Sequence, residues 1–250
     1  TSLRVQKPSQ ITLPSEVASP IRLRCQDLGL KRNGQWLFQN LELNLRGGTL
    51  VAVVGPSGVG KSSLLACICG SERPTTGNIE FLVKEGETRT QETIRPNLGL
   101  IFQSLRLTAH ATVLDNVLFG RLGSYNLRQT LFGFPKNDTQ VAYEILHDLG
   151  IAHLSRKWMT QTSGGEQQRT AIARTLFQNP KIILADEPVS NLDTYYAGRV
   201  MGLLRNNATQ EGKIILCALH DPQLINRFAD LALSLNPEHP EGWRLRKVNA

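Results

Sequence analysis

The sequence predicts an α/β fold with a mainly parallel core sheet, an antiparallel β subdomain and a helical subdomain, on the basis of three observations. Continuous apolar runs at residues 50–54, 182–185 and 214–219 are typical of strands covered on both faces. Long helical segments such as 139–149 and 165–178 lie between such runs, as crossovers between parallel strands require. Before the first run, strict alternation of apolar and polar residues favours antiparallel strands.

The antiparallel part is expected at the beginning of the chain. Alternation starts at Ile21 and continues through residues 36–38 and 41–45, with a turn at residues 46–48. Residues 1–20 contain three prolines and no continuous apolar region. We therefore expect a flexible N-terminal tail there, and not a signal peptide.

The rest of the chain, residues 21–250, is expected to form one domain. The segment 165–178 ends before Pro180, because proline cannot continue a helix. Residues 243–246 predict a closing strand that follows a turn. We expect the helical subdomain at about residues 104–178.

Composition limits the class of protein. The 250 residues, of which 40 % are hydrophobic, correspond to one large or two small domains, and exclude disorder and a fibrous repeat. A net charge of +7 favours negatively charged binding partners, such as nucleotides, nucleic acid or a membrane surface. No apolar run approaches the roughly 18–20 residues that cross a bilayer. The four cysteines show neither a disulfide framework nor zinc-finger spacing, which favours a reducing cytosol.

The strongest local motif follows the apolar run at residues 50–54 and opens a helical stretch. It matches G-x-x-x-x-G-K-[ST], with strand, loop and helix in the required order, which disfavours a mere glycine-rich turn. The loop lets N–H groups converge on phosphate oxygens, and the helix N-terminus adds positive charge. Lys61 is expected to reach the β- and γ-phosphates, and the Ser62 hydroxyl to ligate Mg²⁺. The predicted nucleotide-binding residues here are Gly55, Pro56, Ser57, Gly58, Val59, Gly60, Lys61, Ser62 and Ser63.

Two carboxylates end the apolar run at residues 182–185. Asp186 and Glu187 are expected at the carboxyl edge of the parallel sheet, beside the phosphate loop. Asp186 is placed to hold Mg²⁺ directly or through water, and Glu187 to polarise an attacking water as general base. A solvated acidic strand end is the alternative, which the phosphate loop disfavours.

A second anion-binding turn identifies a family. Ser163, Gly164 and Gly165 open the helical segment 165–178, where free N–H groups can bind an anion. An enzyme with one nucleotide needs no second turn of this kind, whereas a homodimer does if each turn closes on the other chain's γ-phosphate. With these motifs in this order, the sequence resembles the ATPase subunits of ABC transporters over about residues 21–248.

The resemblance implies further site residues. Gln103 resembles the Q-loop glutamine, which contacts Mg²⁺ or water and senses the membrane partner. Residues 190–193, ending in Asp193, resemble the D-loop that crosses the dimer interface, and His220 resembles the switch histidine that touches the γ-phosphate. The expected ligands are ATP and Mg²⁺. The expected catalytic residues are Glu187, His220 and Gln103, and the expected metal-binding residues are Ser62, Gln103 and Asp186.

Three positions depart from the family pattern. Thr162 and Glu166 stand where the signature usually has leucine and glutamine. Glu166 either faces the phosphate and weakens binding, or lies in the first helical turn and favours the helix dipole; the intact Ser-Gly-Gly turn favours the second interpretation. The adenine-stacking aromatic would fall near Asn33, which cannot stack. Trp36 either substitutes for it or is a core residue.

The segment 113–123, which runs into residues 132–135, resembles the phosphonate importer ATPases. In the family this region faces the coupling helix of the permease, and so carries partner identity. The resemblance implies an ATP-hydrolysing subunit that energises uptake of phosphonate or a related phosphorus compound. The alternative is an accessory ABC ATPase of a carbon–phosphorus lyase assembly or another non-transport ABC module.

The same resemblance implies partners and a location. The expected partners are a second copy of the chain, integral-membrane permease subunits and, through the permease, a periplasmic or lipoprotein solute-binding protein. No nucleic acid is expected. The expected location is the cytoplasmic face of the cell membrane, as a peripheral protein.

Overall fold

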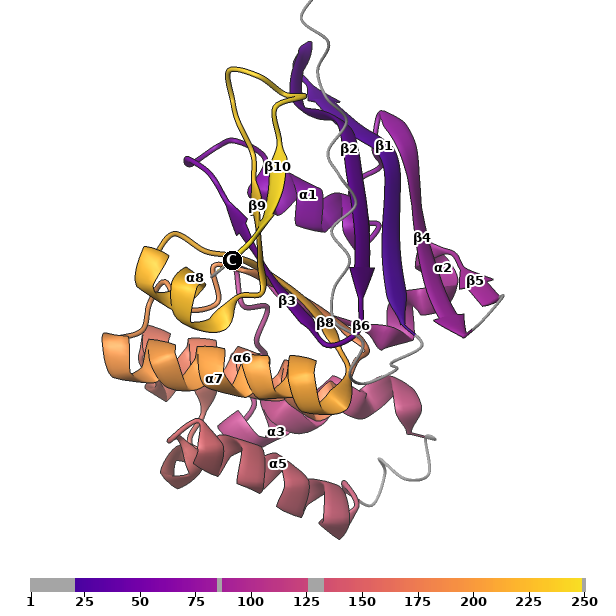
Figure 1. Ribbon diagram of the computed structural model, residues 1–250. Coiled ribbons are helices and arrows are strands. Elements are labelled where there is room, and N and C mark those ends of the chain that lie inside the picture. Colours follow the sequence, from indigo (N-terminus) through magenta and orange to yellow (C-terminus); the bar gives the residue numbers. More distant parts are fainter. Residues whose placement is uncertain (1–20, 85–86, 126–132, 249–250) are drawn as a thin grey trace, which may run out of the picture.

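The computed structural model describes residues 21–84, 87–125 and 133–248, which form two β-sheets and a set of helices (Figure 1). The tail expected at residues 1–20 lies outside the described residues, and so does Phe132. In the described ranges, no helix is both long enough and apolar enough to span a bilayer. The four cysteines are buried and free, in line with the absence of a disulfide framework.

The larger sheet has six strands in the order β10-β9-β3-β8-β7-β6. The β10–β9 pair is antiparallel and the remaining pairs are parallel, which confirms the mainly parallel sheet predicted from the apolar runs. The strands are β3 (Thr49–Val54), β6 (Leu98–Ile101), β7 (Ile182–Asp186), β8 (Ile214–Ala218), β9 (Leu231–Ser234) and β10 (Arg244–Lys247).

The smaller sheet is antiparallel, with four strands in the order β2-β1-β4-β5. The two alternating segments predicted at residues 36–38 and 41–45 belong to one strand, β2. The strands are β1 (Arg22–Arg32), β2 (Gln35–Arg46), β4 (Thr76–Lys84) and β5 (Glu87–Arg89).

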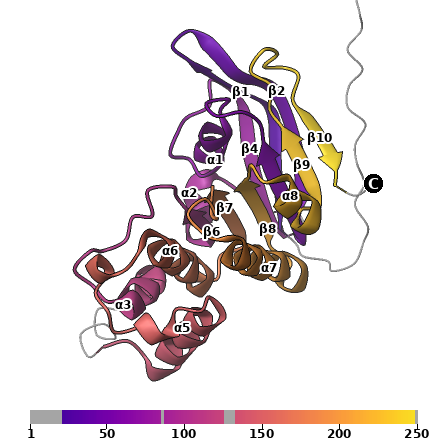
Figure 2. The same ribbon diagram turned by 90° about the vertical axis from the view of Figure 1, so that its left-hand side faces the viewer.

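The helices lie on both sides of the larger sheet. α3, α5 and α6 pack on one another and gather at the end of the molecule away from the smaller sheet (Figure 2). The α-helices are α1 (Lys61–Ile68), α2 (Gln91–Ile94), α3 (Val113–Leu118), α5 (Lys136–Asp148), α6 (Gly164–Gln178), α7 (Thr194–Glu211) and α8 (Pro222–Phe228). The 3-10 helices are η1 (Arg95–Asn97), η2 (Phe119–Ser124), η3 (Ala152–Leu154) and η4 (Met159–Gln161).

The larger sheet separates two hydrophobic cores. Val51 and Val53 of β3 belong to the core shared with α1 and the smaller sheet. Leu50 and Ala52 point the other way, into the core shared with α3 and α5 to α8. Because both faces are covered, the strand has no polar alternation, and this explains the continuous apolar run in the sequence.

The 3-10 helix η2 packs closely on α6 through Gly120. A Cβ atom at this position would collide with the backbone carbonyl oxygen of Arg174. The next residue, Arg121, donates from Nε to the Phe177 carbonyl at 2.6 Å and pairs with Asp138 at 3.0 Å. Gly123, in contrast, has open space around it. The first two residues of this Gly-Arg-Leu-Gly segment therefore fix η2 against α6.

We predict that Gly120→Ala lowers the free energy of unfolding by about 1–3 kcal/mol, the usual effect of overpacking against a backbone that cannot move away. Denaturant unfolding measures this change. Gly123→Ala is the matched control, and we expect it to change the stability by less than about 0.5 kcal/mol. Equal effects of the two substitutions would contradict the close packing of Gly120 on α6.

Candidate functional site

The loop between β3 and α1 has a backbone conformation that requires glycine. Gly55 has φ +146°, and a Cβ atom there would lie 2.9 Å from the Leu235 carbonyl oxygen. Gly60 has φ +108° and directly precedes the first residue of α1. These conformations let the loop curl over the N-terminus of α1, where backbone N–H groups are free to bind an anion.

Lys61 lies buried under this loop, with 5 % of its surface exposed. Its ammonium donates to the carbonyl oxygens of Gly55 at 2.9 Å and Pro56 at 3.0 Å. Burial lowers the pKa of Lys61, while the carboxylates of Glu187 and Asp186 oppose this shift. The two carbonyl oxygens that bind this buried ammonium are neutral, so an anion in the loop would stabilise its positive charge strongly. The loop therefore suits a phosphate group.

Parallel pairing brings four of the predicted residues to one edge of the larger sheet. Asp186 is the last residue of β7, where it pairs with Ala218 of β8, and Glu187 follows it. His220 comes two residues after β8, and Gln103 two residues after β6. Since β3 also ends at this edge, the carboxylates lie beside the phosphate loop, as the sequence predicted.

Glu187 and His220 are hydrogen-bonded to each other. His220 Nε2 lies 2.8 Å from Glu187 Oε1. A cavity of about 200 Å³ adjoins this pair and is also lined by Ser190 and Asp221. Several water molecules fit in a cavity of that size, since a water takes about 30 Å³. The Glu187 carboxylate and the His220 ring can therefore contact water in this cavity.

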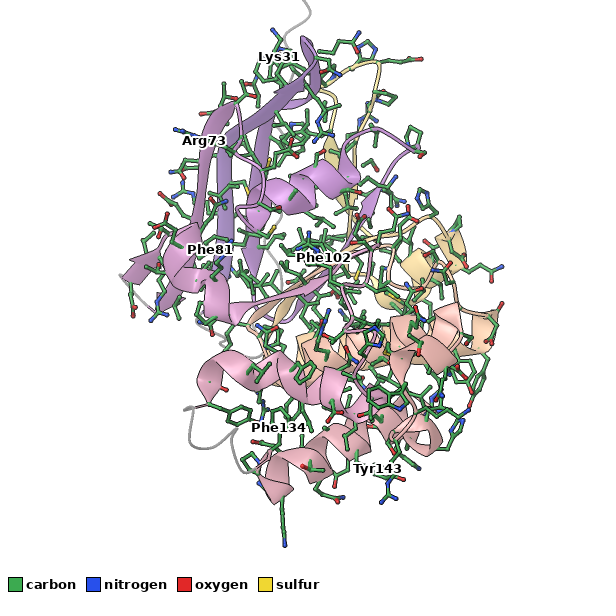
Figure 3. The ribbon with its side chains drawn as sticks, turned by 180° about the vertical axis from the view of Figure 1, so that it is seen from behind. Lys31, Arg73, Phe81, Phe102, Phe134 and Tyr143 are labelled. Carbon is green, nitrogen blue, oxygen red and sulfur yellow. The ribbon has the colours of Figure 1, made fainter. Side chains whose placement is uncertain are left out.

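The segment after β6 is exposed at Gln103 and strained just beyond it. Leu105 and Arg106 have φ +38° and +48°, in the left-handed region that non-glycine residues avoid. The Arg174 guanidinium on α6 donates to their carbonyl oxygens at 2.8 Å and 2.7 Å. Figure 3 shows Phe102, on which the Arg106 guanidinium stacks at 3.9 Å, at the junction between the sheets and the helices. Arg174 thus fixes the segment that carries Gln103.

The Ser-Gly-Gly turn forms the N-terminus of α6. Ser163 caps the helix, its hydroxyl accepting from the Glu166 N–H at 3.4 Å, while the Glu166 carboxylate accepts from the Ser163 N–H at 2.7 Å. That backbone hydrogen bond lowers the pKa of Glu166. The expectation that Glu166 lies in the first helical turn is confirmed. Its carboxylate forms a capping box with Ser163.

The turn at residues 190–193 lies between β7 and α7 and packs against the N-terminus of α6. Asp193 caps α7, where its carboxylate accepts from the Tyr196 N–H at 2.9 Å. A Cβ atom on Gly165 would lie 3.1 Å from the Asn191 carbonyl oxygen, so the two turns touch. Among the described residues, the hydrogen bonds of Ser163, Gly164 and Gly165 stay near α6 and do not reach the loop at residues 55–62. The structure does not bring the two anion-binding turns together within the chain.

Of Asn33 and Trp36, the two positions near the expected base contact, only Trp36 carries an aromatic ring. Asn33 lies in an exposed turn with φ +50°. Trp36 is half-buried, and the Lys31 ammonium lies 5.8 Å from the centre of its ring. Trp36 belongs to neither hydrophobic core among the described residues, which disfavours its interpretation as a core residue.

Ser62 and Asp186 are the oxygen-bearing residues that fit Mg²⁺ bound together with a nucleotide. No cluster of three or more histidine, cysteine or acidic side chains in the described ranges could hold a metal ion. The exposed Ser62 and the half-buried Asp186 carry a hydroxyl and a carboxylate, which are hard oxygen ligands. Mg²⁺ commonly combines such a pair with phosphate oxygens and water.

Sequence reasoning missed two polar side chains of α6, the buried Gln168 and the half-buried Arg174. Arg174 holds the segment after β6, and Gln168 donates to the Glu187 carbonyl oxygen at 2.9 Å. Both partners are distant in the chain, so no local pattern reveals these contacts. The only signal is a polar residue on the apolar face of an amphipathic helix.

Comparison with known proteins gives consistent matches. Residues 38–190 match the family described as ABC transporter. The phosphonates import ATP-binding protein of Lactobacillus johnsonii is 40 % identical, over 81 % of this chain and 82 % of the relative. The corresponding protein of Trichormus variabilis is 37 % identical, over 80 % and 82 %. A dimeric ATP-binding cassette solved with ADP and Pi superposes with a TM-score of 0.76 at 28 % identity, covering 91 % of this chain and 99 % of that one.

We predict that Glu166→Gln changes the pH dependence of stability. The lowered pKa means that the ionised carboxylate stabilises the folded chain above the ordinary glutamate pKa of about 4.3, and that this stabilisation is lost as pH falls through the folded-state pKa. Urea unfolding between pH 7 and pH 3 should therefore show a constant difference between wild type and E166Q near neutrality, which shrinks at acid pH. A difference that does not change with pH would argue against the capping box.

Proposed function

Because the chain belongs to the ABC transporter family, we propose that it is the ATP-binding and ATP-hydrolysing subunit of an importer. The cargo we propose is phosphonate or a related phosphorus compound, carried through a membrane permease. The observation that carries the ATPase assignment is the meeting of the phosphate loop with Asp186, Glu187 and His220 at one sheet edge. The proposed cargo rests on the names of the relatives.

The relatives favour import over the alternative functions. Two of them are named as phosphonates import proteins, and a hypophosphite import ATP-binding protein of Stutzerimonas stutzeri is 36 % identical over 84 % of this chain and 63 % of the relative. These names describe import of small phosphorus oxyanions. They give no support to a role in a carbon–phosphorus lyase assembly.

The phosphate loop supplies binding. The N–H groups of residues 55–63 and the positive end of α1 hold the phosphates, and Lys61 exchanges its two carbonyl partners for phosphate oxygens. Ser62 and Asp186, with Gln103 directly or through water, are the residues that would hold Mg²⁺. When bound, this ion neutralises charge on the phosphates.

Glu187 and His220 supply the catalytic groups. Glu187 orients the attacking water and accepts its proton, as general base. His220 holds the Glu187 carboxylate in place through the 2.8 Å hydrogen bond and contacts the γ-phosphate. The Ser163-Gly164-Gly165 turn covers the γ-phosphate of a second copy, and Asp193 lies at the interface between the copies. Positioning and charge stabilisation then account for catalysis.

The assembly we propose has further members. Two copies of this chain form a dimer, as in the dimeric cassette whose fold it shares. The dimer drives integral-membrane permease subunits, from the cytoplasmic face of the membrane. A periplasmic or lipoprotein solute-binding protein delivers the cargo to the permease.

We predict that Glu187→Gln binds ATP but hydrolyses it at least about 100-fold more slowly, because loss of a general base costs about 10²–10⁴ in rate. ATP should then trap the dimer. Phosphate release in the steady state measures the first effect, and size-exclusion chromatography with ATP measures the second. Glu144→Gln, on the exposed face of α5, is the matched control. A fully active E187Q enzyme would refute the role of Glu187.

We predict that Lys61→Ala loses measurable ATP binding, since it removes the buried positive charge beneath the phosphates. Isothermal titration calorimetry with ATP measures the affinity. Lys181→Ala, which removes an exposed lysine at the opposite end of β7, should bind ATP as the wild type does. An unchanged affinity of K61A would show that the phosphates bind elsewhere.

A further inference from the structure

A buried glutamine joins α6 to the turn that carries Glu187. The Gln168 side chain is 2 % exposed, and both ends of its amide are used. Its Nε2 donates to the Glu187 carbonyl oxygen at 2.9 Å, and its Oε1 accepts from the Asn191 N–H at 3.3 Å. One side chain thus holds the start and the middle of the turn between β7 and α7.

The backbone conformation of that turn must be stabilised by contacts from other elements. Glu187 has φ +50°, a conformation that costs a non-glycine residue of the order of 1 kcal/mol and persists only where neighbours impose it. The Glu187 carbonyl also accepts from Ser190, from the hydroxyl at 3.1 Å and from the N–H at 3.3 Å. Those two bonds lie within the turn itself. Gln168 supplies a bond from another element, which fixes the turn relative to α6.

The same helix carries the anion-binding turn at its N-terminus. Gln168 lies three residues, slightly less than one helical turn, beyond Gly165, and Gly165 itself packs against the Asn191 backbone. A displacement of the N-terminus of α6 therefore acts on the Glu187 turn through two adjacent contacts. α6 connects the residues that cover one ATP with the base that acts on another.

We propose that Gln168 is a positioning residue, which holds the Glu187 turn so that the carboxylate meets His220, and which transmits movements of α6 to that carboxylate. This inference rests on the proposed function, because it takes Glu187 as the general base. Gln168 does not touch the nucleotide, and its effect on the reaction passes through Glu187. Closure of the Ser163-Gly164-Gly165 turn on a second copy's phosphate then aligns the base in the first copy.

The test is Gln168→Met, which keeps the size and flexibility of the side chain but removes both hydrogen bonds. We expect kcat for ATP hydrolysis to fall about 10-fold, with the Kd for ATP within 2-fold of wild type, because the phosphate loop is untouched. The matched control is Gln178→Met. That glutamine lies on the same helix and donates at 3.0 Å to the Leu98 carbonyl, away from the site. We expect Q178M to retain the wild-type kcat.

A double-mutant cycle separates positioning from general destabilisation. If Gln168 acts through Glu187, Gln168→Met should have less than a 2-fold effect on the residual rate of E187Q. A further 10-fold loss in that background would overturn the proposal, as would full activity of Q168M.

A second variant keeps the proposal testable if Q168M does not fold. Gln168→Glu keeps the acceptor for Asn191 and removes the donor, and we expect the same loss of kcat. Failure of both variants to fold would show a purely structural role and would also overturn the proposal. Full activity of E187Q alone would instead refute the proposed function.

Discussion

The parallel register of β3, β8, β7 and β6 is the constraint on which the site depends. Each strand ends at the same edge of the sheet, and each is followed within two residues by a residue with a proposed binding or catalytic role. A slip of one residue in any pair would turn that strand's side chains to the opposite face, and both faces are fully buried cores. The hydrophobic packing of the sheet therefore fixes where Asp186, Glu187 and His220 lie.

Helix α6 adds a second level of organisation. Its N-terminus forms the Ser-Gly-Gly turn, its middle holds the Glu187 turn through Gln168, and its later part holds the strained segment after β6 through Arg174. The left-handed segments at Leu105–Arg106 and at Glu187 thus both receive hydrogen bonds from one helix. Rigid-body movement of α6 would reach the base, the Gln103 segment and the anion-binding turn together, which suits a subunit that couples hydrolysis to a partner in the membrane.

The sequence predicted those parts of the site that depend on local chain continuity. Lys61 belongs to a motif that follows the apolar run at residues 50–54, and Asp186 directly follows the run at residues 182–185, so their motifs place them without any knowledge of packing. β6 was not predicted, because Gly99 interrupts its short apolar pattern; in the fold, a Cβ atom there would collide with Pro180 and Thr175. Gln168 and Arg174 were missed because their partners are distant in sequence. Gly120 and Arg121, assigned to partner identity from the resemblance, also contact α6.

The central claim is that each ATP is bound by the phosphate loop of one copy and covered by the Ser-Gly-Gly turn of the other. Mixing two inactive variants tests it most directly: Lys61→Ala, with a defective phosphate loop, and Gly164→Asp, which introduces a negative charge into the turn at a position with open space for a side chain. The account predicts that the mixture regains ATPase activity well above the sum of the two variants, because each mixed dimer contains one intact composite site. A mixture as inactive as its components, under conditions where mixed dimers form, would contradict it.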